Sequence, residues 1–253
     1  MLNSVARSFS RGAQNYDLYA QIQHGVVDHL CSMIGENIIN AESILDLGCG
    51  TGRLLQYCNE VNPNAKLTGL DISSEMLAQV KFRGMPINCV EAAIESTGLE
   101  AGKYDLIVSS SALQWTQPVL AAAEIARLSA YNGKVVISWF SFGTLSSWRE
   151  LWGGVHRPLL ESDQWLDAFK TVGFKVTQVD RQCYVDQMTN FEQAIRSVKG
   201  IGAGVGSAGS RSISKANYLR AKKQFDEFVL KNGFFPMEYQ TEFVLLGKSA
   251  RVS

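Results

Sequence analysis

A short apolar run that ends in closely spaced glycines is the segment of this sequence best suited to bind a ligand. Residues 44–52 read Ile-Leu-Asp-Leu-Gly-Cys-Gly-Thr-Gly, with Asp46 just before the glycines. Glycine lets the chain turn sharply and lets the backbone lie against a ligand where a Cβ would clash. A helical pattern over residues 51–60 follows, and the first N–H groups of a helix attract polar and anionic groups. The segment therefore predicts a site for a nucleotide-like ligand.

The spacing of the glycines distinguishes between kinds of nucleotide. Dinucleotide-binding loops read G-x-G-x-x-G, but Arg53 stands at the third glycine position here. A nicotinamide dehydrogenase is therefore nearly excluded. The carboxylate of Asp46 would repel a pyrophosphate, whereas it suits an ammonium or sulfonium centre, as in S-adenosylmethionine. Residues 66–71 read as a second strand that ends in Asp71, and this carboxylate can accept hydrogen bonds from both ribose hydroxyls. The alternative interpretation is that the glycines only make a tight turn and that Asp71 caps the next helix.

Together these residues resemble motifs one and two of the class I S-adenosylmethionine-dependent methyltransferases, over about residues 40–140. In that family an acid after the third strand usually binds the adenine amino group, but Ala93 stands at that place, so backbone groups of Ala93 and Ile94, or the side chain of Glu95, would take this role. The cofactor contacts that the resemblance implies are Gln23, Asp46, Gly48, Cys49, Gly50, Gly52, Asp71, Ile72, Ala93, Ile94, Ser109 and Ser110.

The elements that position these residues alternate between strand and helix. Apolar runs predict five strands, at residues 44–47, 66–70, 87–91, 104–109 and 134–140. Helical periodicity predicts helices at 14–34, 51–60, 74–82 and 118–130. This alternation predicts an α/β fold with a doubly wound, mostly parallel, Rossmann-like sheet.

The pattern changes after residue 140. Residues 144–170, 190–199 and 214–232 look helical, 175–179 could form a strand, and 239–248 would pair back into the sheet. We expect one domain over residues 1–253, with an N-terminal cap helix (1–35), a cofactor-binding core (40–140), a helical lid inserted before the last strand (about 184–233) and a closing strand (239–248). The second glycine cluster, at 200–209, follows no strand and is interpreted as a flexible loop.

Composition narrows the functional class. The 253 residues carry no net charge, which gives no global electrostatic reason for binding nucleic acid or a membrane. The five cysteines include no C-x-x-C pair, which argues against a disulfide framework and a metal site, and favours a reducing cytoplasm.

A motif after the fourth strand points to the substrate. Ala112-Leu113-Gln114-Trp115 resembles two groups of methyltransferases, one that esterifies malonyl-acyl-carrier protein at the start of biotin synthesis and one that esterifies trans-aconitate. Three further segments, at 9–23, 142–145 and 198–203, resemble the first group. In that group the opening helix folds over the cofactor, which implies that Tyr16 borders the transferred methyl group; alternatively, Tyr16 is a buried helix aromatic.

A carboxylate substrate decides which catalytic groups to expect. It is ionised at neutral pH, by analogy with Asp at a pKa of ~3.9, so no general base is expected, and the three scattered histidines are interpreted as structural. A cation should orient the carboxylate, and Arg149, Arg157 and Lys199 remain alternatives.

The stretch 196–231 is strongly basic and could dock an acidic carrier protein, or be a solvated helix surface. Its cations are Arg196, Lys199, Arg211, Lys215, Arg220, Lys222, Lys223 and Lys231, against Asp226 and Glu227. The expected substrate contacts are Gln114, Trp115, Arg149, Arg157, Lys199, Arg211 and Lys222.

The leading hypothesis is a methyltransferase that uses S-adenosylmethionine to esterify the free carboxylate of malonyl-acyl-carrier protein, or of malonyl-coenzyme A, so that the masked chain can be elongated toward pimelate. The alternatives are a small-molecule carboxyl methyltransferase of the trans-aconitate type and a non-catalytic cofactor-binding protein.

Overall fold

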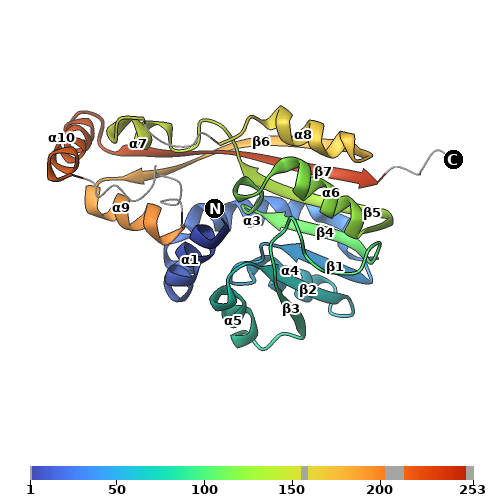
Figure 1. Cartoon of the computed structure of the whole chain (residues 1–253). Helices are drawn as coiled ribbons and strands as arrows, with labels where there is room; N and C mark the ends of the chain where they lie inside the picture. Colours follow the sequence, from blue (N-terminus) through green and yellow to red (C-terminus); the bar gives the residue numbers. More distant parts are fainter. Residues whose placement is uncertain (1, 155–158, 203–213, 249–253) are drawn as a thin grey trace.

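The computed structural model describes residues 2–154, 159–202 and 214–248, and its centre is one seven-stranded sheet (Figure 1). The strand order is β3-β2-β1-β4-β5-β7-β6. Strands β1 to β5 are parallel to one another, and β7 is antiparallel to both β5 and β6. The predicted doubly wound, mostly parallel sheet is confirmed. The strands are β1 (Ser43–Leu47), β2 (Lys66–Asp71), β3 (Ile87–Glu91), β4 (Tyr104–Ser110), β5 (Ser129–Phe140), β6 (Phe174–Met188) and β7 (Phe235–Lys248).

Helices cover both faces of the sheet, which explains why its central strands are apolar on both sides. Ile44 on β1 points to the face covered by α3 (Gln21–Ile34), α4 (Arg53–Val61) and α5 (Ser74–Phe82). Leu45, its neighbour, points to the face covered by α6 (Pro118–Leu128) and α8 (Ser162–Thr171). Both side chains are fully buried. Asp46 is therefore an acid in a strand that otherwise belongs to the core.

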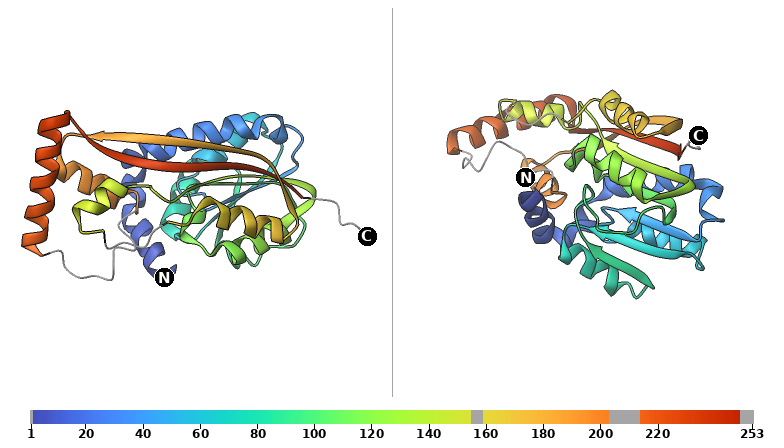
Figure 2. Two further views of the ribbon diagram at one scale, coloured as in Figure 1. Left: turned by 90° about the horizontal axis from the view of Figure 1, so that it is seen from above. Right: turned by 45° about the vertical axis from the view of Figure 1, so that its right-hand side comes forward.

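Strands β6 and β7 are longer than the other strands and form an arm beyond the sheet (Figures 1 and 2). The last residue of β5, Phe140, pairs with Thr241, so residues 235–240 of β7 pair only with β6. Six residues of strand span about 20 Å at ~3.4 Å each. The arm carries α9 (Phe191–Gly200) and α10 (Lys215–Asn232) at its far end. They lie well outside the central sheet.

The arm corrects the predicted boundaries. Strand β6 runs from Phe174 to Met188 instead of covering 175–179, and β7 begins at Phe235 instead of 239. The insertion predicted at about 184–233 therefore starts only after Met188. Most β6 side chains are exposed or half-buried because β6 is the edge strand, and so the apolar signal is weak. The helix predicted at 144–170 is two helices, α7 (Ser146–Leu151) and α8.

The N-terminal segment lies over the core as three short pieces and one longer helix. These are α1 (Leu2–Gly12), η1 (Ala13–Asn15), α2 (Tyr16–Tyr19) and α3, so the helix predicted at 14–34 is interrupted before Gln21. The end of α9 packs against this segment. A Cβ on Gly200 would lie 2.5 Å from the Tyr19 ring, and one on Gly202 would lie 2.9 Å from the Phe9 ring. These two glycines of the cluster at 200–209 thus allow close packing, and residues 203–209 lie outside the described part of the chain.

Candidate active site

A cavity opens where the carboxyl ends of β1, β2 and β4 meet the N-terminal segment. It encloses about 660 Å³, including space open to solvent. In open α/β sheets, ligands bind at this edge. The predicted cofactor contacts that line the cavity are Gly48, Gly50, Asp71, Ile72, Ala93, Ile94 and Ser110. Lining residues outside that prediction are Val5, Phe9, Leu70, Met76, Ala92, Glu95, Ser111, Ala112 and Thr116.

The glycine loop forms one wall of the cavity and needs its glycines for different reasons. Gly48, Gly50 and Gly52 all have positive φ, at 72°, 53° and 86°. A Cβ on Gly48 would lie 2.3 Å from the Cβ of Ala112, whereas one on Gly50 would meet nothing within 4 Å. Gly48 therefore brings the loop against the segment after β4, and Gly50 leaves its backbone free to face a ligand.

Asp71 holds this loop in place. Its Oδ2 accepts a hydrogen bond from the Gly50 N–H at 2.9 Å, and its Oδ1 accepts one from the Ser73 N–H, also at 2.9 Å. Burial raises the pKa of Asp71, and these N–H donors oppose the shift. The residue that caps α5 is Ser73, whose Oγ accepts from the Met76 N–H. The alternative interpretation of Asp71 as the helix cap is therefore wrong, and its carboxylate borders the cavity.

Asp46 carries a buried carboxylate oxygen that needs a partner. The side chain is 1% exposed, and its Oδ2 has no hydrogen-bond donor among the described residues. Burial, together with the nearby charge of Asp71, raises the pKa of Asp46 to about 8. The Oε1 of Gln23, on α3, is likewise buried without a donor in the described chain. An unpaired buried acceptor is costly, so these atoms fit a ligand that brings a cation or N–H donors.

Three aromatic side chains stand together at the cavity. The ring centroid of Phe9 lies 6.3 Å from that of Tyr16 and 5.8 Å from that of Trp115, in the second case edge to face. All three line the cavity. Burial and the charges of Asp71 and Asp17 raise the pKa of Tyr16, which stays protonated at neutral pH. This cluster joins the N-terminal segment to the loop after β4.

Ala93 and Ile94, which follow β3, also line the cavity, together with Glu95. The Oε1 of Glu95 accepts a hydrogen bond from the Gln117 N–H at 3.2 Å, while its buried Oε2 has no donor among the described residues. Glu95 therefore presents a buried acceptor without a donor in the described chain.

Three other predicted contacts point elsewhere. Ser109 donates to the Leu47 carbonyl oxygen at 2.7 Å between adjacent strands, and Cys49 is buried against Gly69. Gln114 donates to the Ser111 carbonyl oxygen at 2.5 Å and accepts from the Phe140 N–H at 3.4 Å. Gln114 therefore fixes the loop after β4, and its neighbour Trp115 is the one that reaches the cavity.

The cations proposed from sequence do not line the cavity. Arg149 on α7 is half-buried, which lowers its pKa, and it has no ion-pair partner in the described ranges. Lys199 is exposed on α9, and Lys222 pairs with Glu192 at 3.1 Å and with Asp226 at 3.5 Å. Arg157 and Arg211 lie outside the described residues.

The remaining features concern possible metal ligands, the histidines and membrane-spanning helices. Within residues 2–154, 159–202 and 214–248, no group of acids, cysteines and histidines could hold a metal ion. His29 pairs with Asp180 at 2.7 Å, and His24 lies 3.7 Å from Asp17. The helices of the described chain include none that is long and apolar enough to cross a membrane.

Comparison with known proteins agrees with this geometry. Residues 45–137 match the family model "Methyltransferase domain". A malonyl-[acyl-carrier protein] O-methyltransferase of Marinomonas sp. is 32% identical over 95% of this chain and 92% of its own length. The biotin biosynthesis bifunctional protein BioHC of Saccharophagus degradans is 30% identical over 96% of this chain, which spans 46% of that protein.

A solved geranyl diphosphate methyltransferase in complex with SAM shares the fold. Its TM-score is 0.57 at 12% identity, and the match covers 88% of this chain and 84% of that chain. The full-length relative and the matching domain together establish the family. The chain belongs to the malonyl-[acyl-carrier protein] O-methyltransferases.

Proposed function

We propose that the protein transfers a methyl group from S-adenosylmethionine to the free carboxylate of malonyl-acyl-carrier protein. The observation that carries the proposal is the unpartnered, buried Oδ2 of Asp46 beside the glycine loop. The amino group or the sulfonium centre of this cofactor would supply the positive charge that this oxygen lacks.

The chain offers groups for each part of the cofactor. Asp46 and Gln23 would hold the methionine end, since both have buried acceptors without donors in the described chain. Asp71 would hold the ribose, because each of its oxygens retains a lone pair after bonding to a backbone N–H. Glu95, with the backbone of Ala93 and Ile94, would bind the adenine ring. When bound, the cofactor supplies an electrophilic methyl group on sulfur.

The rest of the site then has to desolvate and aim the substrate. A malonyl carboxylate is ionised at neutral pH, since carboxylic acids of this kind have a pKa of ~4, and so no proton has to be removed. Phe9, Tyr16 and Trp115 form an apolar wall that excludes water, which strengthens the nucleophile.

The arm formed by β6 and β7 favours a carrier-bound substrate over a small acid. Helix α10 carries five cations, Lys215, Arg220, Lys222, Lys223 and Lys231, against Asp226 and Glu227, a net charge of +3 (5 − 2) in a chain of zero net charge. The arm holds this helix about 20 Å past the end of β5. An acidic carrier protein docked there would present its substrate on a long, flexible prosthetic group that reaches back to the cavity.

A direct assay separates the candidate functions. The protein is incubated with methyl-labelled S-adenosylmethionine and, in parallel, with malonyl-acyl-carrier protein, malonyl-coenzyme A or trans-aconitate. We expect base-labile label on the malonyl thioesters, with the lowest KM for the carrier protein. Label on trans-aconitate alone would overturn the proposal, and cofactor binding without label on any acid would identify a non-catalytic binding protein.

If the first outcome holds, we also propose a place in metabolism. Masking one malonyl carboxylate as an ester removes its charge, so the chain resembles an ordinary acyl primer that can be elongated toward pimelate in biotin synthesis. The biotin-related name of one relative supports this assignment.

A further inference from the structure

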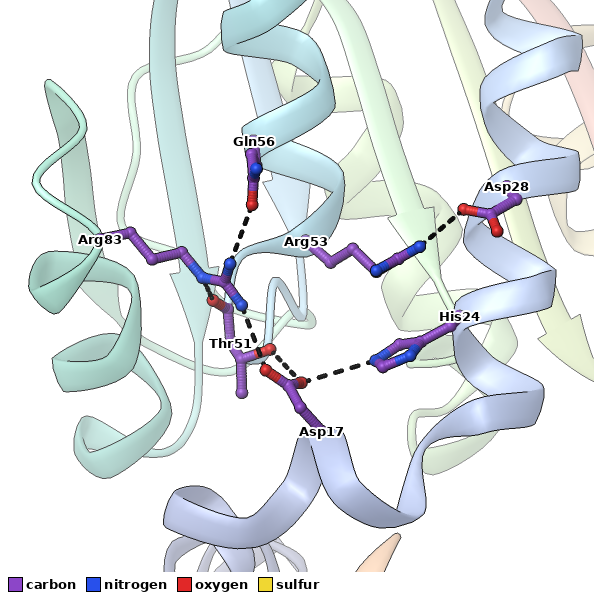
Figure 3. Close-up of polar contacts among 7 residues, drawn as sticks. All are labelled: Asp17, His24, Asp28, Thr51, Arg53, Gln56 and Arg83. Atoms are coloured by element: carbon purple, nitrogen blue, oxygen red, sulfur yellow. Dashed lines mark hydrogen bonds and ion pairs between the residues drawn. The ribbon is translucent and has the colours of Figure 1, made fainter.

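Polar side chains tie the N-terminal segment directly to the glycine loop (Figure 3). Asp17, which follows Tyr16 on α2, accepts a hydrogen bond at Oδ1 from the Thr51 hydroxyl at 2.8 Å. Its Oδ2 lies 3.2 Å from Nη2 of Arg83, at the end of α5. Nε2 of His24, on α3, lies 3.7 Å from Oδ1. One carboxylate thus joins α2, α3, α5 and the loop after β1.

Arg83 makes further contacts at the same junction. Its Nε donates to the Thr51 carbonyl oxygen at 2.7 Å, and its Nη1 donates to the Gln56 side chain at 2.9 Å. Thr51 lies between Gly50 and Gly52. Arg83 therefore binds the backbone of the glycine loop, and Asp17 binds the side chain of Thr51 in that loop. We name the set Asp17, Thr51 and Arg83 the clasp.

The clasp lies next to the part of the N-terminal segment that closes the cavity. This cap, residues 2–19, contributes Val5, Phe9 and Tyr16 to the cavity wall. Among the described residues, its other polar attachment to the core is Ser10, which donates to Glu75 at 2.5 Å and lies 3.1 Å from the Ser73 hydroxyl. Few polar contacts among the described residues therefore hold the cap, and Asp17 is adjacent in sequence to Tyr16, a residue of the cavity wall.

We propose that Asp17 is a positioning residue that keeps the cap closed over the cofactor, and that breaking the clasp speeds cofactor release. The contacts of Phe9 and Tyr16 with a ligand exist only while the cap is closed. The apparent dissociation constant is the intrinsic constant divided by the fraction of closed molecules. Loss of the clasp lowers that fraction and so weakens binding, although no side chain of the clasp lines the cavity.

The proposal rests on the proposed function only in taking S-adenosylmethionine as the ligand, and its test does not use methyl transfer. Calorimetry measures the Kd of S-adenosylmethionine and of its demethylated product for Asp17→Asn, which loses the charge but keeps an acceptor for Thr51. We expect both Kd values to rise about tenfold, equivalent to ~1.4 kcal/mol. Arg83→Gln should act in the same direction, since it removes the other half of the ion pair.

The second readout is cap opening itself. Arg7 and Arg11 are exposed on α1, and trypsin cleaves there only after the helix has opened. We expect faster cleavage in Asp17→Asn than in the wild type, and slower cleavage of both when cofactor is added.

Asp28→Asn is the matched control. Asp28, on α3, is likewise a carboxylate paired with an arginine, at 3.0 Å from Arg53, and no described contact joins it to the cap or to Thr51 (Figure 3). This variant should keep the wild-type Kd and cleavage rate. Kd values and cleavage rates of Asp17→Asn within twofold of the control would overturn the proposal. A wild-type protein that binds no S-adenosylmethionine would instead overturn the proposed function, while the trypsin comparison would still test the clasp.

Discussion

Asp46 should destabilise the empty protein and stabilise the loaded one. At pH 7 the unfolded chain releases the Asp46 proton, at an ordinary pKa of 3.8, whereas the folded chain, with a pKa of about 8, retains it. Stability from a raised pKa is full below the unfolded value and is lost as the pH rises through the folded value. Each pH unit in this window costs ~1.4 kcal/mol, so the loss at pH 7 is about 4 kcal/mol.

The perturbation is Asp46→Asn, which has nearly the same shape and does not titrate. At pH 5 the corresponding loss in the wild type is less than half as large. The variant should therefore become more stable than the wild type by a margin that grows by about 3 kcal/mol between pH 5 and pH 7. The buried, unpaired amide of the asparagine lowers the stability of the variant equally at every pH, because an amide does not titrate. It therefore does not change how the margin depends on pH.

Urea unfolding of both proteins without cofactor, at pH 5, 6 and 7, measures this margin. The same experiment with S-adenosylmethionine at 100 times its wild-type Kd should add ~2.7 kcal/mol to the wild type and much less to the variant. A margin that stays constant with pH would refute the assignment of a raised pKa to Asp46. Equal stabilisation of both proteins by the cofactor would refute its role in binding.

Three further changes test the loop, the wall and the docking helix. Gly48→Ala places a Cβ 2.3 Å from that of Ala112 at a φ of 72°, and should cost roughly 1–3 kcal/mol in thermal unfolding, whereas Gly50→Ala, with open space around it, should cost less. Phe9→Ala removes the ring that joins Tyr16 to Trp115, and should raise the cofactor Kd about tenfold in calorimetry, that is by ~1.4 kcal/mol; an unchanged Kd would mean that the wall does not touch the cofactor. The double variant Arg220→Glu/Lys231→Glu reverses two exposed charges on one side of α10 and should raise KM for malonyl-acyl-carrier protein about tenfold or more, but leave KM for malonyl-coenzyme A unchanged. The control variant Lys175→Glu, at the other end of β6, should change neither KM. Equal effects of the double variant on both substrates would argue against docking on α10.

The sequence predicted the parts of the site that lie within one element and its loop. The glycines, Asp46 and Asp71 are close in sequence to strands whose apolar runs are unmistakable, because both faces of β1 and β2 are buried. Family resemblance added Tyr16 and Trp115, which lie at the cavity. These residues could be predicted from the sequence because each belongs to a short motif.

The contacts between distant elements could not be predicted in this way. The pairing of Asp17 with Thr51 and Arg83 joins residues 34 and 66 positions apart, and no periodicity relates them. Gln114 was assigned to substrate from its motif, but its amide bonds to Ser111 and Phe140, a choice that depends on how β5 ends. The length of β6 could not be predicted from the sequence either, since an edge strand exposes many of its side chains and therefore lacks a continuous apolar run.

The place of β7 in the sheet has a consequence for synthesis of the protein. Strand β7 lies between β5 and β6, although both precede it in the chain. After β5 has left the ribosome, residues 141–234 must be made before β7 arrives, which takes between roughly 5 and 20 s at ~5–20 residues per second. During this time the outer edge of β5 has no neighbouring strand, and an open edge can pair with another chain. The edge of β5 is therefore a point at which a nascent chain of this protein is open to aggregation.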